Sequence, residues 1–237
     1  MLFGGYIMKQ NHQDRIWDTF QNTESLIDIA FSNKKRLNFL ANRVSPKCRV
    51  LNIGIGKGLL EELLIQKKVD VYCLDPNEKT VDRIRKKLNL GEKAKVGYSQ
   101  SIPFPDNYFD VVIMSEVLEH LEDNILHQTL KEVKRVLKKN GRFIGTVPAD
   151  ENLKVSLTIC PYCGKIFHRW GHVRSFSKES LYNLLKQYFR EVRISRKYFT
   201  DFEKLNWKGK FVGIIKILQA FLDMKSSNLS FYFEAKK

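Results

Sequence analysis

The 237-residue sequence has no apolar run that approaches the roughly 18 residues a membrane-spanning helix needs. Its first residues, MLFGGYIMKQ, lack the long apolar stretch and the small-residue cleavage site of a secretory signal peptide. There are only four cysteines, and without an export signal they argue against a disulfide framework. These absences predict a protein of the reducing cytoplasm.

Acidic residues are scarce relative to basic ones. The chain has 26 Asp and Glu against 41 Lys and Arg, a net charge of +15, and residues 151–237 alone hold 17 basic and 7 acidic residues, a net of +10. A field of this sign attracts nucleic acid, an anionic membrane surface or an anionic substrate, although solubility alone explains it equally well. With 43% hydrophobic residues, a wholly disordered chain is excluded.

Short apolar runs alternate with segments typical of helices along the first two thirds of the chain. The predicted strands are 49–53, 69–74, 95–98, 109–114 and 142–147, and the predicted helical segments are 11–45, 59–68, 80–88 and 124–139. Strands that alternate with helices at this spacing imply right-handed crossovers and a mostly parallel sheet covered on both faces.

A glycine-rich turn follows the first predicted strand. Gly54, Gly56 and Gly58 permit positive φ angles and a close approach of a ligand to the backbone, and the helix that follows offers free N–H groups. Asp75 ends the second strand, 19 residues after Gly56, where an acid meets a ribose in nucleotide-binding βαβ units. The alternative role for Asp75 is a helix N-cap.

Four segments, in order, resemble the class I S-adenosylmethionine-dependent methyltransferases of the type-11 kind. They are VLNIGIGKG, CLDPN, SIPFPDNYFDVVIMSEVLEHL and LKEVKRVLKKNGRFIGTVP, within residues 48–148. The resemblance implies an α/β fold with a Rossmann-like, doubly wound, mostly parallel seven-stranded sheet, helices on both faces and an antiparallel last strand. FREVRIS and NLSFYFEAK would be the final two strands.

The expected organisation is a helical cap before a methyltransferase domain. The cap covers residues 1–46 and the domain covers 47–237. Within the domain we expect a Cys/His insert at 151–178 and an amphipathic helical insert at 203–225.

The resemblance implies S-adenosylmethionine as the cofactor. Residues that match the family's cofactor positions are Asn52, Gly54, Gly56, Gly58, Asp75, Pro76, Gln100, Ser101, Ile102, Ser115 and Glu116. In the family Asp75 would hold both ribose hydroxyls. Asn52 departs from the acidic residue frequent there, and Gln100 would replace the usual acidic partner of the adenine amino group. NAD is the rival cofactor, but the third glycine of its fingerprint would fall one residue early, at Gly58.

For methyl transfer, the protein mainly has to align the acceptor with the methyl group and exclude water. A general base is needed only where the acceptor starts protonated, as a sugar hydroxyl does. The candidates for catalysis are Glu116, His120 and His172, with His168 nearby in sequence. For His120 the alternative is a packed, hydrogen-bonded core histidine.

A cysteine and histidine cluster lies in CPYCGKIFHRWGH. Cys160, Cys163, His168 and His172 follow the spacing C-x2-C-x4-H-x3-H, which suits a tetrahedral Zn²⁺ site. Two alternatives stay open. One is a metal-free lid whose His172 faces the substrate, and the other is a redox pair of the two thiols.

Residues 205–224 carry apolar side chains at helical spacing: Trp207, Phe211, Ile214, Leu218 and Phe221. One interpretation is a peripheral helix that contacts an anionic membrane or a lipid-linked substrate. The other is a helix that packs on the sheet or covers the active site.

The leading functional hypothesis is methyl transfer to an oxygen of a small molecule or glycan precursor, anionic in character. An RNA or protein methyltransferase is the first alternative. Against nucleic acid, the fourth strand ends in MSEV, without the [DN]-PP-[YF] motif that the resemblance associates with base amino groups, and no RNA module is visible. A non-catalytic homologue that binds the cofactor is the other alternative.

Overall fold

The computed structural model describes residues 12–23, 26 and 33–237, so residues 1–11, 24–25 and 27–32 of the expected cap lie outside the described residues. The described helices are α1 (His12–Asn22), α3 (Lys34–Ala41), α4 (Leu59–Gln66), α5 (Glu78–Leu88), α6 (Asp123–Val136), α7 (Lys178–Lys186) and α8 (Trp207–Phe221). Short 3-10 turns are η1 (Gly91–Lys93), η2 (Leu118–His120), η3 (Leu153–Ser156) and η4 (Phe202–Lys204).

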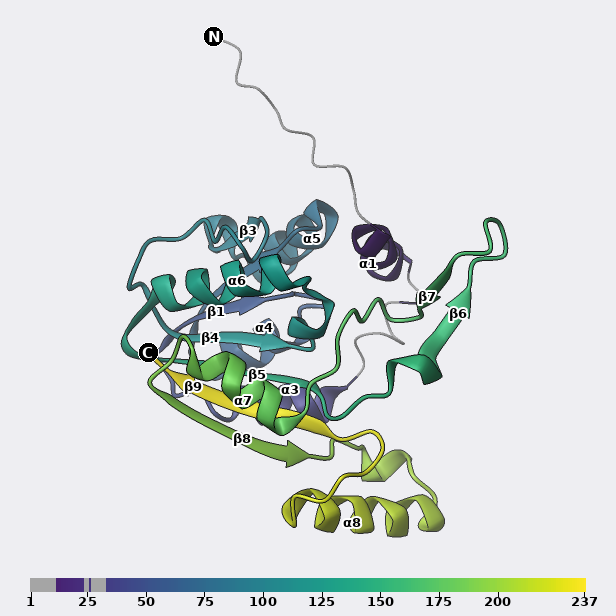
Figure 1. Ribbon diagram of the computed structural model, residues 1–237. Coiled ribbons are helices and arrows are strands. Elements are labelled where there is room, and N and C mark those ends of the chain that lie inside the picture. The colour runs from purple at the N-terminus through teal and green to yellow at the C-terminus, as the bar shows by residue number, and fades with distance from the viewer. Residues whose placement is uncertain (1–11, 24–25, 27–32) are drawn as a thin grey trace.

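One seven-stranded sheet organises the molecule (Figure 1). Its strands are β1 (Arg49–Ile53), β2 (Asp70–Asp75), β3 (Ala94–Val96), β4 (Phe109–Ser115), β5 (Leu137–Pro148), β8 (Glu191–Lys197) and β9 (Ser230–Lys236). The order across the sheet is β3-β2-β1-β4-β5-β9-β8. Strand β9 runs antiparallel to its neighbours, β5 and β8. The predicted Rossmann-like, mostly parallel sheet with an antiparallel last strand is therefore confirmed.

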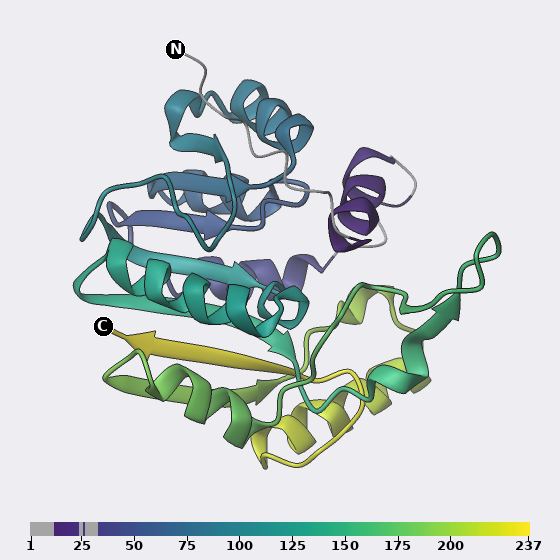
Figure 2. The ribbon, with the colours of Figure 1, turned by 45° about the horizontal axis from the view of Figure 1, so that its top comes forward.

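The two faces of the sheet hold separate parts of the core, as the helix layers in Figures 1 and 2 show. Leu51 and Ile53 of β1 pack in the cluster that includes α6 and α7, whereas Val50 packs with α3 and α4. Successive strand residues face opposite sides, so a strand covered on both faces is apolar throughout. Val81 and Ile84 of α5 extend the second face over β2 and β3.

The predicted end of the helix before β5 is wrong. The helix stops at Val136, and residues 137–140 belong to β5 rather than to a helix capped at Asn140-Gly141. The backbone amides of Asn107 and Tyr108 donate to the carbonyls of Arg135 and Val136. These carbonyls are therefore taken by the segment that leads into β4, and β5 begins at the next residue, Leu137.

The predicted Cys/His insert forms a two-stranded hairpin, β6 (Leu157–Ile159) and β7 (Ile166–His168). Figure 2 shows the hairpin projecting from the edge toward which β4 points, and α1 lies at the same edge. Residues that follow the hairpin return to the main body, where Val173 donates to the carbonyl of Glu119.

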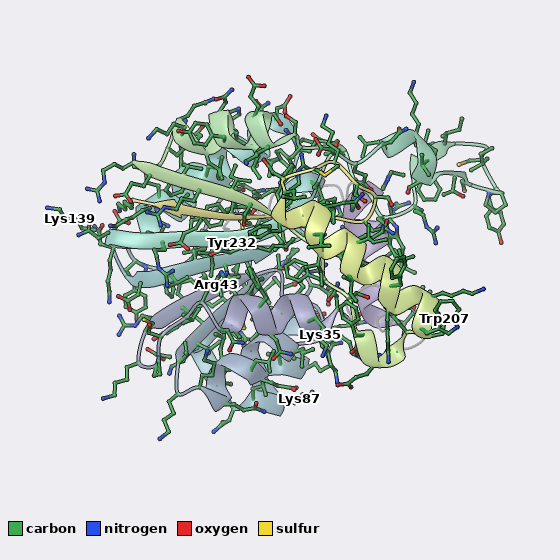
Figure 3. All side chains as sticks on the ribbon, turned by 90° about the horizontal axis from the view of Figure 1, so that it is seen from below. Lys35, Arg43, Lys87, Lys139, Trp207 and Tyr232 are labelled. Carbon is green, nitrogen blue, oxygen red and sulfur yellow. The ribbon has the colours of Figure 1, made fainter. Side chains whose placement is uncertain are left out.

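Helix α8 packs through its small residues and not through the predicted apolar stripe. Gly213 and Ala220 are buried, and a Cβ atom at Gly213 would lie 3.0 Å from the Phe202 ring. The stripe residues Trp207, Phe211, Ile214, Leu218 and Phe221 are 53–84% exposed. Figure 3 shows Trp207 at the end of α8 that lies away from the sheet. The helix therefore contacts the sheet at β8 through its small residues, and the predicted apolar stripe remains exposed.

Among the described residues, we find no helix that combines the length and the apolar character required to cross a bilayer.

The close approach of β4 and β5 depends on Gly145. A Cβ atom there would lie 1.9 Å from the Met114 carbonyl oxygen and 2.6 Å from the Phe233 ring. We expect Gly145→Ala to lower the free energy of unfolding by about 1–3 kcal/mol or more, because the core must shift to accept the methyl group. Denaturant unfolding checks this.

The control is Gly91→Ala, whose Cβ has open space but whose φ of 51° favours glycine. It should cost only about 1 kcal/mol. A Gly145→Ala variant that loses no more stability than this control would contradict the close packing of the two strands.

Candidate functional site

A cavity of about 350 Å³ opens at the carboxyl edge of the sheet, where β1, β2 and β4 end. This size falls within the roughly 300–1,000 Å³ of small-molecule sites. Of the residues predicted from the sequence, those that line it are Asn52, Gly54, Gly56, Asp75, Pro76, Gln100, Ser115, Glu116 and His120. Parallel strands bring these residues, which are far apart in the sequence, to one edge.

The glycine turn after β1 forms the floor of the cavity. Gly54 and Gly56 have φ angles of 89° and 56°, in the left-handed region that favours glycine. A Cβ atom at Gly54 would lie 2.8 Å from the side chain of Val117. The turn therefore presents bare backbone to the cavity, as the sequence predicted.

Asp75 is the buried carboxylate at the centre of this edge, with 1% of its surface exposed. Its Oδ2 accepts from the backbone amide of Ile55 at 2.9 Å, and its Oδ1 accepts from that of Asn77 at 3.0 Å. Burial raises the pKa of Asp75, and the two amide hydrogen bonds oppose that rise. The N-cap of α5 is Asn77, which accepts from the Thr80 amide, so the capping alternative for Asp75 is wrong.

The amide of Asn52 has a specific partner that the sequence did not reveal. Its Nδ2 donates to Oε1 of Glu61 at 2.6 Å, and both side chains are buried. Burial raises the pKa of Glu61 to about 7. An acid at position 52 would put two carboxylates in contact, so the amide suits its buried acidic partner.

Three of the predicted cofactor residues do not line the cavity. Gly58 begins α4 in a left-handed conformation and packs against Ile84, 2.3 Å from where its Cβ would lie. The Ile102 side chain is buried in the core, and its backbone amide donates to Glu132 of α6. Ser101 lies exposed beside it and is also absent from the lining. The loop therefore faces α6 at these positions instead of the cavity.

The two N-terminal helices contribute lining residues that sequence reasoning missed. Trp17, Asp18 and Gln21 of α1 and Arg36 of α3 reach the cavity. Gln21 donates to Asp75 Oδ2 at 3.4 Å and accepts from the Thr80 hydroxyl at 3.0 Å. No local motif marks these residues, because only the fold brings α1 over the edge.

Glu116 lies after β4 in a left-handed conformation, with a φ of 56°. Its backbone amide donates to the Thr146 carbonyl, and its carboxylate lies 3.7 Å from the Arg36 guanidinium. Arg36 also donates to the Ser115 hydroxyl at 3.1 Å. Glu116 Oε1 is buried without a hydrogen-bond partner among the described residues. A cation and a carboxylate thus face each other beside the cavity.

The predicted catalytic histidines lie together, although only His120 lines the cavity. The ring centroid of His120 is 4.8 Å from that of His172 and 4.7 Å from that of Trp17. Burial lowers the pKa of His120 to about 3, so its imidazole is neutral near pH 7. His172 Nδ1 is hydrogen-bonded to Glu151 Oε2 at 2.5 Å.

The four-residue Zn²⁺ site predicted from the sequence is not assembled. Cys160 and Cys163 lie in the turn between β6 and β7, while His168 and His172 lie at the base of the hairpin. Backbone amides of the turn, from Cys163 and Tyr162, lower the pKa of Cys160. Both histidines lie instead near carboxylates, in the sets Glu119/His120/His172 and Glu151/His168/His172. The strand between the turn and His168 keeps the thiols apart from the imidazoles.

Comparison with known proteins shows which proteins this chain resembles. Residues 51–145 match the model of the methyltransferase domain family. The chain is 29% identical over 223 residues to the ubiquinone/menaquinone biosynthesis C-methyltransferase of Rickettsia bellii, covering 86% of this chain and 88% of that protein. These two matches support a class I S-adenosylmethionine-dependent methyltransferase.

Solved structures of methyltransferases have the same fold. One is an S-adenosylmethionine-dependent methyltransferase of Archaeoglobus fulgidus, with a TM-score of 0.59, 20% identity, and coverage of 96% of this chain and 100% of that one. Another is the 1,6-didemethyltoxoflavin-N1-methyltransferase of Burkholderia thailandensis, solved with S-adenosylhomocysteine. It has a TM-score of 0.63, 13% identity, and coverage of 95% of this chain and 86% of that one.

The contact between Asn52 and Glu61 predicts a pH-dependent effect in this methyltransferase. In Asn52→Asp, two carboxylates would touch, and both would bind protons more tightly in the folded state than in the unfolded state. The variant should therefore lose about 1–3 kcal/mol at pH 8 and recover stability as the pH falls toward 5. Thermal unfolding over this pH range checks the prediction.

The matched control is the double variant Asn52→Asp/Glu61→Gln, which restores one amide and one acid. It should recover most of the lost stability at pH 8. Equal stability of Asn52→Asp and the wild type at pH 8 would show that the contact does not act as described.

Proposed function

We propose that the protein transfers a methyl group from S-adenosylmethionine to an oxygen of a small molecule or glycan precursor. The observation that carries the choice of oxygen is the group formed by Glu116, His120 and His172 beside the cavity. A hydroxyl acceptor must lose a proton, and the Glu116 carboxylate and the His172 imidazole can accept one, whereas the low pKa of His120 makes that residue a weak base. A neutral amine acceptor has less need of such a group, because its lone pair is already free to attack the methyl carbon.

The cofactor would occupy the cavity over the glycine turn. Asp75 is fixed by two backbone amides and presents a carboxylate suited to the ribose hydroxyls. Gly54 and Gly56 leave space for the methionine part, and Gln100 lies where it could meet the adenine. The bound cofactor would supply a methyl group on a sulfonium, and this chain's residues would align the acceptor with it and exclude water.

The acceptor would enter from the side of α1 and the hairpin. Trp17 and Trp170 flank this side, and the Trp170 ring stacks on Phe20 with centroids 5.5 Å apart. Arg36 offers a positive charge beside Glu116 and the Ser115 hydroxyl. Aromatic walls with one guanidinium suit a ring-shaped acceptor that carries an anionic group.

A second candidate is methylation of a ring carbon. The relative in Rickettsia bellii is named as a C-methyltransferase of ubiquinone/menaquinone biosynthesis, and it aligns over most of both chains. An RNA or protein acceptor, which the net charge of +15 also allows, is a further outcome to be tested.

The acceptor class can be measured directly. Enzyme and ¹³C-methyl-labelled S-adenosylmethionine are incubated with small-molecule, lipid, polysaccharide, RNA and protein fractions of a cell extract. We expect label in a small-molecule or glycan fraction, present as a methoxy carbon by ¹³C NMR. Label on a ring carbon would favour the second candidate, and label in RNA or protein would contradict both. Cofactor binding without any transfer would indicate a non-catalytic homologue.

His172→Ala should lower turnover by about 10²–10⁴-fold while leaving cofactor affinity unchanged, because His172 lies outside the cavity lining. The control is His127→Ala, a histidine of α6 that is hydrogen-bonded to Tyr188. Steady-state kinetics and calorimetric titration of the cofactor check both values. Unchanged turnover in His172→Ala would remove this residue from the mechanism.

We also propose that α8 contacts an anionic membrane surface, which would bring the enzyme close to a lipid-linked acceptor. Its large apolar side chains are exposed, and Lys204, Lys208 and Lys210 lie exposed on the same segment. Apolar side chains next to basic ones are typical of helices that bind at the surface of anionic bilayers.

The membrane proposal predicts a loss of binding in Trp207→Asp/Phe221→Asp. Sedimentation with phosphatidylglycerol vesicles measures the bound fraction, which should fall several-fold because both substitutions place charge on exposed apolar positions. Tyr162→Asp, at a 98% exposed aromatic position on the hairpin, is the matched control and should bind as the wild type does. Equal binding by all three proteins would contradict the proposal.

A further inference from the structure

The side chain of Glu119 is a buried carboxylate without hydrogen-bond partners among the described residues. The residue has 0% exposed surface, and neither of its side-chain oxygens has a hydrogen-bond partner among the described residues. A buried carboxylate without partners is costly, and native proteins rarely leave one so. Glu119 lies in the short turn η2 that follows β4, so its side chain is held at the edge of the sheet beside the cavity.

Two imidazoles face the same point as this carboxylate. One carboxylate oxygen of Glu119 and one ring nitrogen each of His120 and His172 lie within 4.8 Å of one another. Ligand atoms around a tetrahedral ion with bonds of about 2.0–2.2 Å lie roughly 3.4 Å apart. Side-chain rotations that move these three atoms by about an ångström would therefore bring them to metal-binding distances.

Hydrogen bonds fix both imidazoles in the form that a metal ion requires. His120 Nδ1 lies 3.2 Å from the Gly171 carbonyl oxygen, and His172 Nδ1 lies 2.5 Å from Glu151 Oε2. Each of these two oxygens accepts a hydrogen bond, so the ring proton of each imidazole lies on Nδ1. The Nε2 lone pair is then free to bind a cation. Metal-binding histidines commonly donate their other N–H to a carbonyl or carboxylate in this way.

We propose that Glu119, His120 and His172 bind a divalent transition-metal ion beside the cofactor cavity, with Glu151 positioning His172. Two imidazole nitrogens and one carboxylate oxygen suit Zn²⁺ or Mn²⁺ better than Mg²⁺, which takes oxygen ligands. Glu116 lies nearby but faces Arg36 and is outside the ligand set.

The neighbouring set Glu151/His168/His172 is less suited to hold the ion. His168 Nδ1 accepts from the backbone amide of His172 at 3.2 Å, so its proton lies on Nε2, which is 3.6 Å from Glu151 Oε1. Glu151 therefore faces ring nitrogens of both histidines, and it is hydrogen-bonded to His172 alone of the two. The hydrogen bond with Glu151 holds His172 in place through its Nδ1.

The site joins the insert to the methyltransferase core. Gly171, with a φ of 72°, brings its carbonyl to His120, and Val173 donates to the Glu119 carbonyl at 3.0 Å. Arg174 donates to the Leu121 carbonyl at 2.8 Å. The inference deepens the proposed function and rests on it for its role. With the ion bound, His120 and His172 would promote the loss of the acceptor proton by holding the cation instead of acting as bases, because a cation here would bind the acceptor hydroxyl and lower its pKa.

Direct binding of the metal tests the proposal without any turnover. Full-length protein, purified without a polyhistidine tag and treated with chelator, is titrated calorimetrically with Zn²⁺ and with Mn²⁺. We expect one ion per chain. Glu119→Gln and His172→Ala should each weaken binding by more than about 100-fold, and Glu151→Gln by about 10–100-fold. Melting curves without metal check that each variant is folded.

Two control variants distinguish this site from binding at histidines or thiols elsewhere in the chain. His127→Ala removes a histidine of α6, and Cys160→Ser/Cys163→Ser removes both thiols of the hairpin, so both should bind the metal as the wild type does. Absence of binding by the wild type would overturn the proposal, as would binding that survives Glu119→Gln and His172→Ala or that disappears in the thiol variant.

The two proposals can fail separately. A protein that binds no metal but methylates an oxygen would overturn only the metal site. A protein that binds one ion through Glu119 but methylates carbon would overturn only the proposed acceptor.

Discussion

The hydrogen bonds from the Ile55 and Asn77 amides to the Asp75 carboxylate hold the centre of the site. One amide belongs to the glycine turn after β1, and the other belongs to the N-cap of α5. The carboxylate therefore joins the ends of two neighbouring parallel strands and fixes the shape of the cavity floor. Burial raises the pKa of this carboxyl group, and the two amide hydrogen bonds oppose that rise and hold the carboxylate in place.

In this methyltransferase, the fold assigns the two sides of the cavity to different segments of the chain. Turns after β1, β2 and β4 build the cofactor side, and their geometry is dictated by a parallel sheet with helices on both faces. Segments outside that pattern, namely α1, α3 and the hairpin of β6 and β7, surround the other side. Acceptor choice would therefore depend on parts of the chain that can change without disturbing the sheet.

Sequence reasoning recovered what local chemistry determines. The glycine turn, the position of Asp75 at the end of β2 and the alternation of strands and helices along the chain all follow from short-range patterns. It failed where contacts between segments that are distant in the sequence determine the local structure. The helix before β5 ends early because the amides of Asn107 and Tyr108 take its last carbonyls.

The metal-ligand prediction failed for a related reason. Spacing along the chain grouped His172 with Cys160, but the hairpin separates the thiols from the histidines and folding brings Glu119 to His172. In the same way, no pattern within α1 indicates that Gln21 reaches Asp75.

The most direct test of the cofactor site is a crystal structure of the full chain with S-adenosylhomocysteine. We expect the ribose hydroxyls on the Asp75 carboxylate, the amino-acid part over Gly54 and Gly56, and the sulfur directed toward Glu116 and His120. Ligand bound at another place, or bound here with Asp75 turned away from the ribose, would contradict this arrangement.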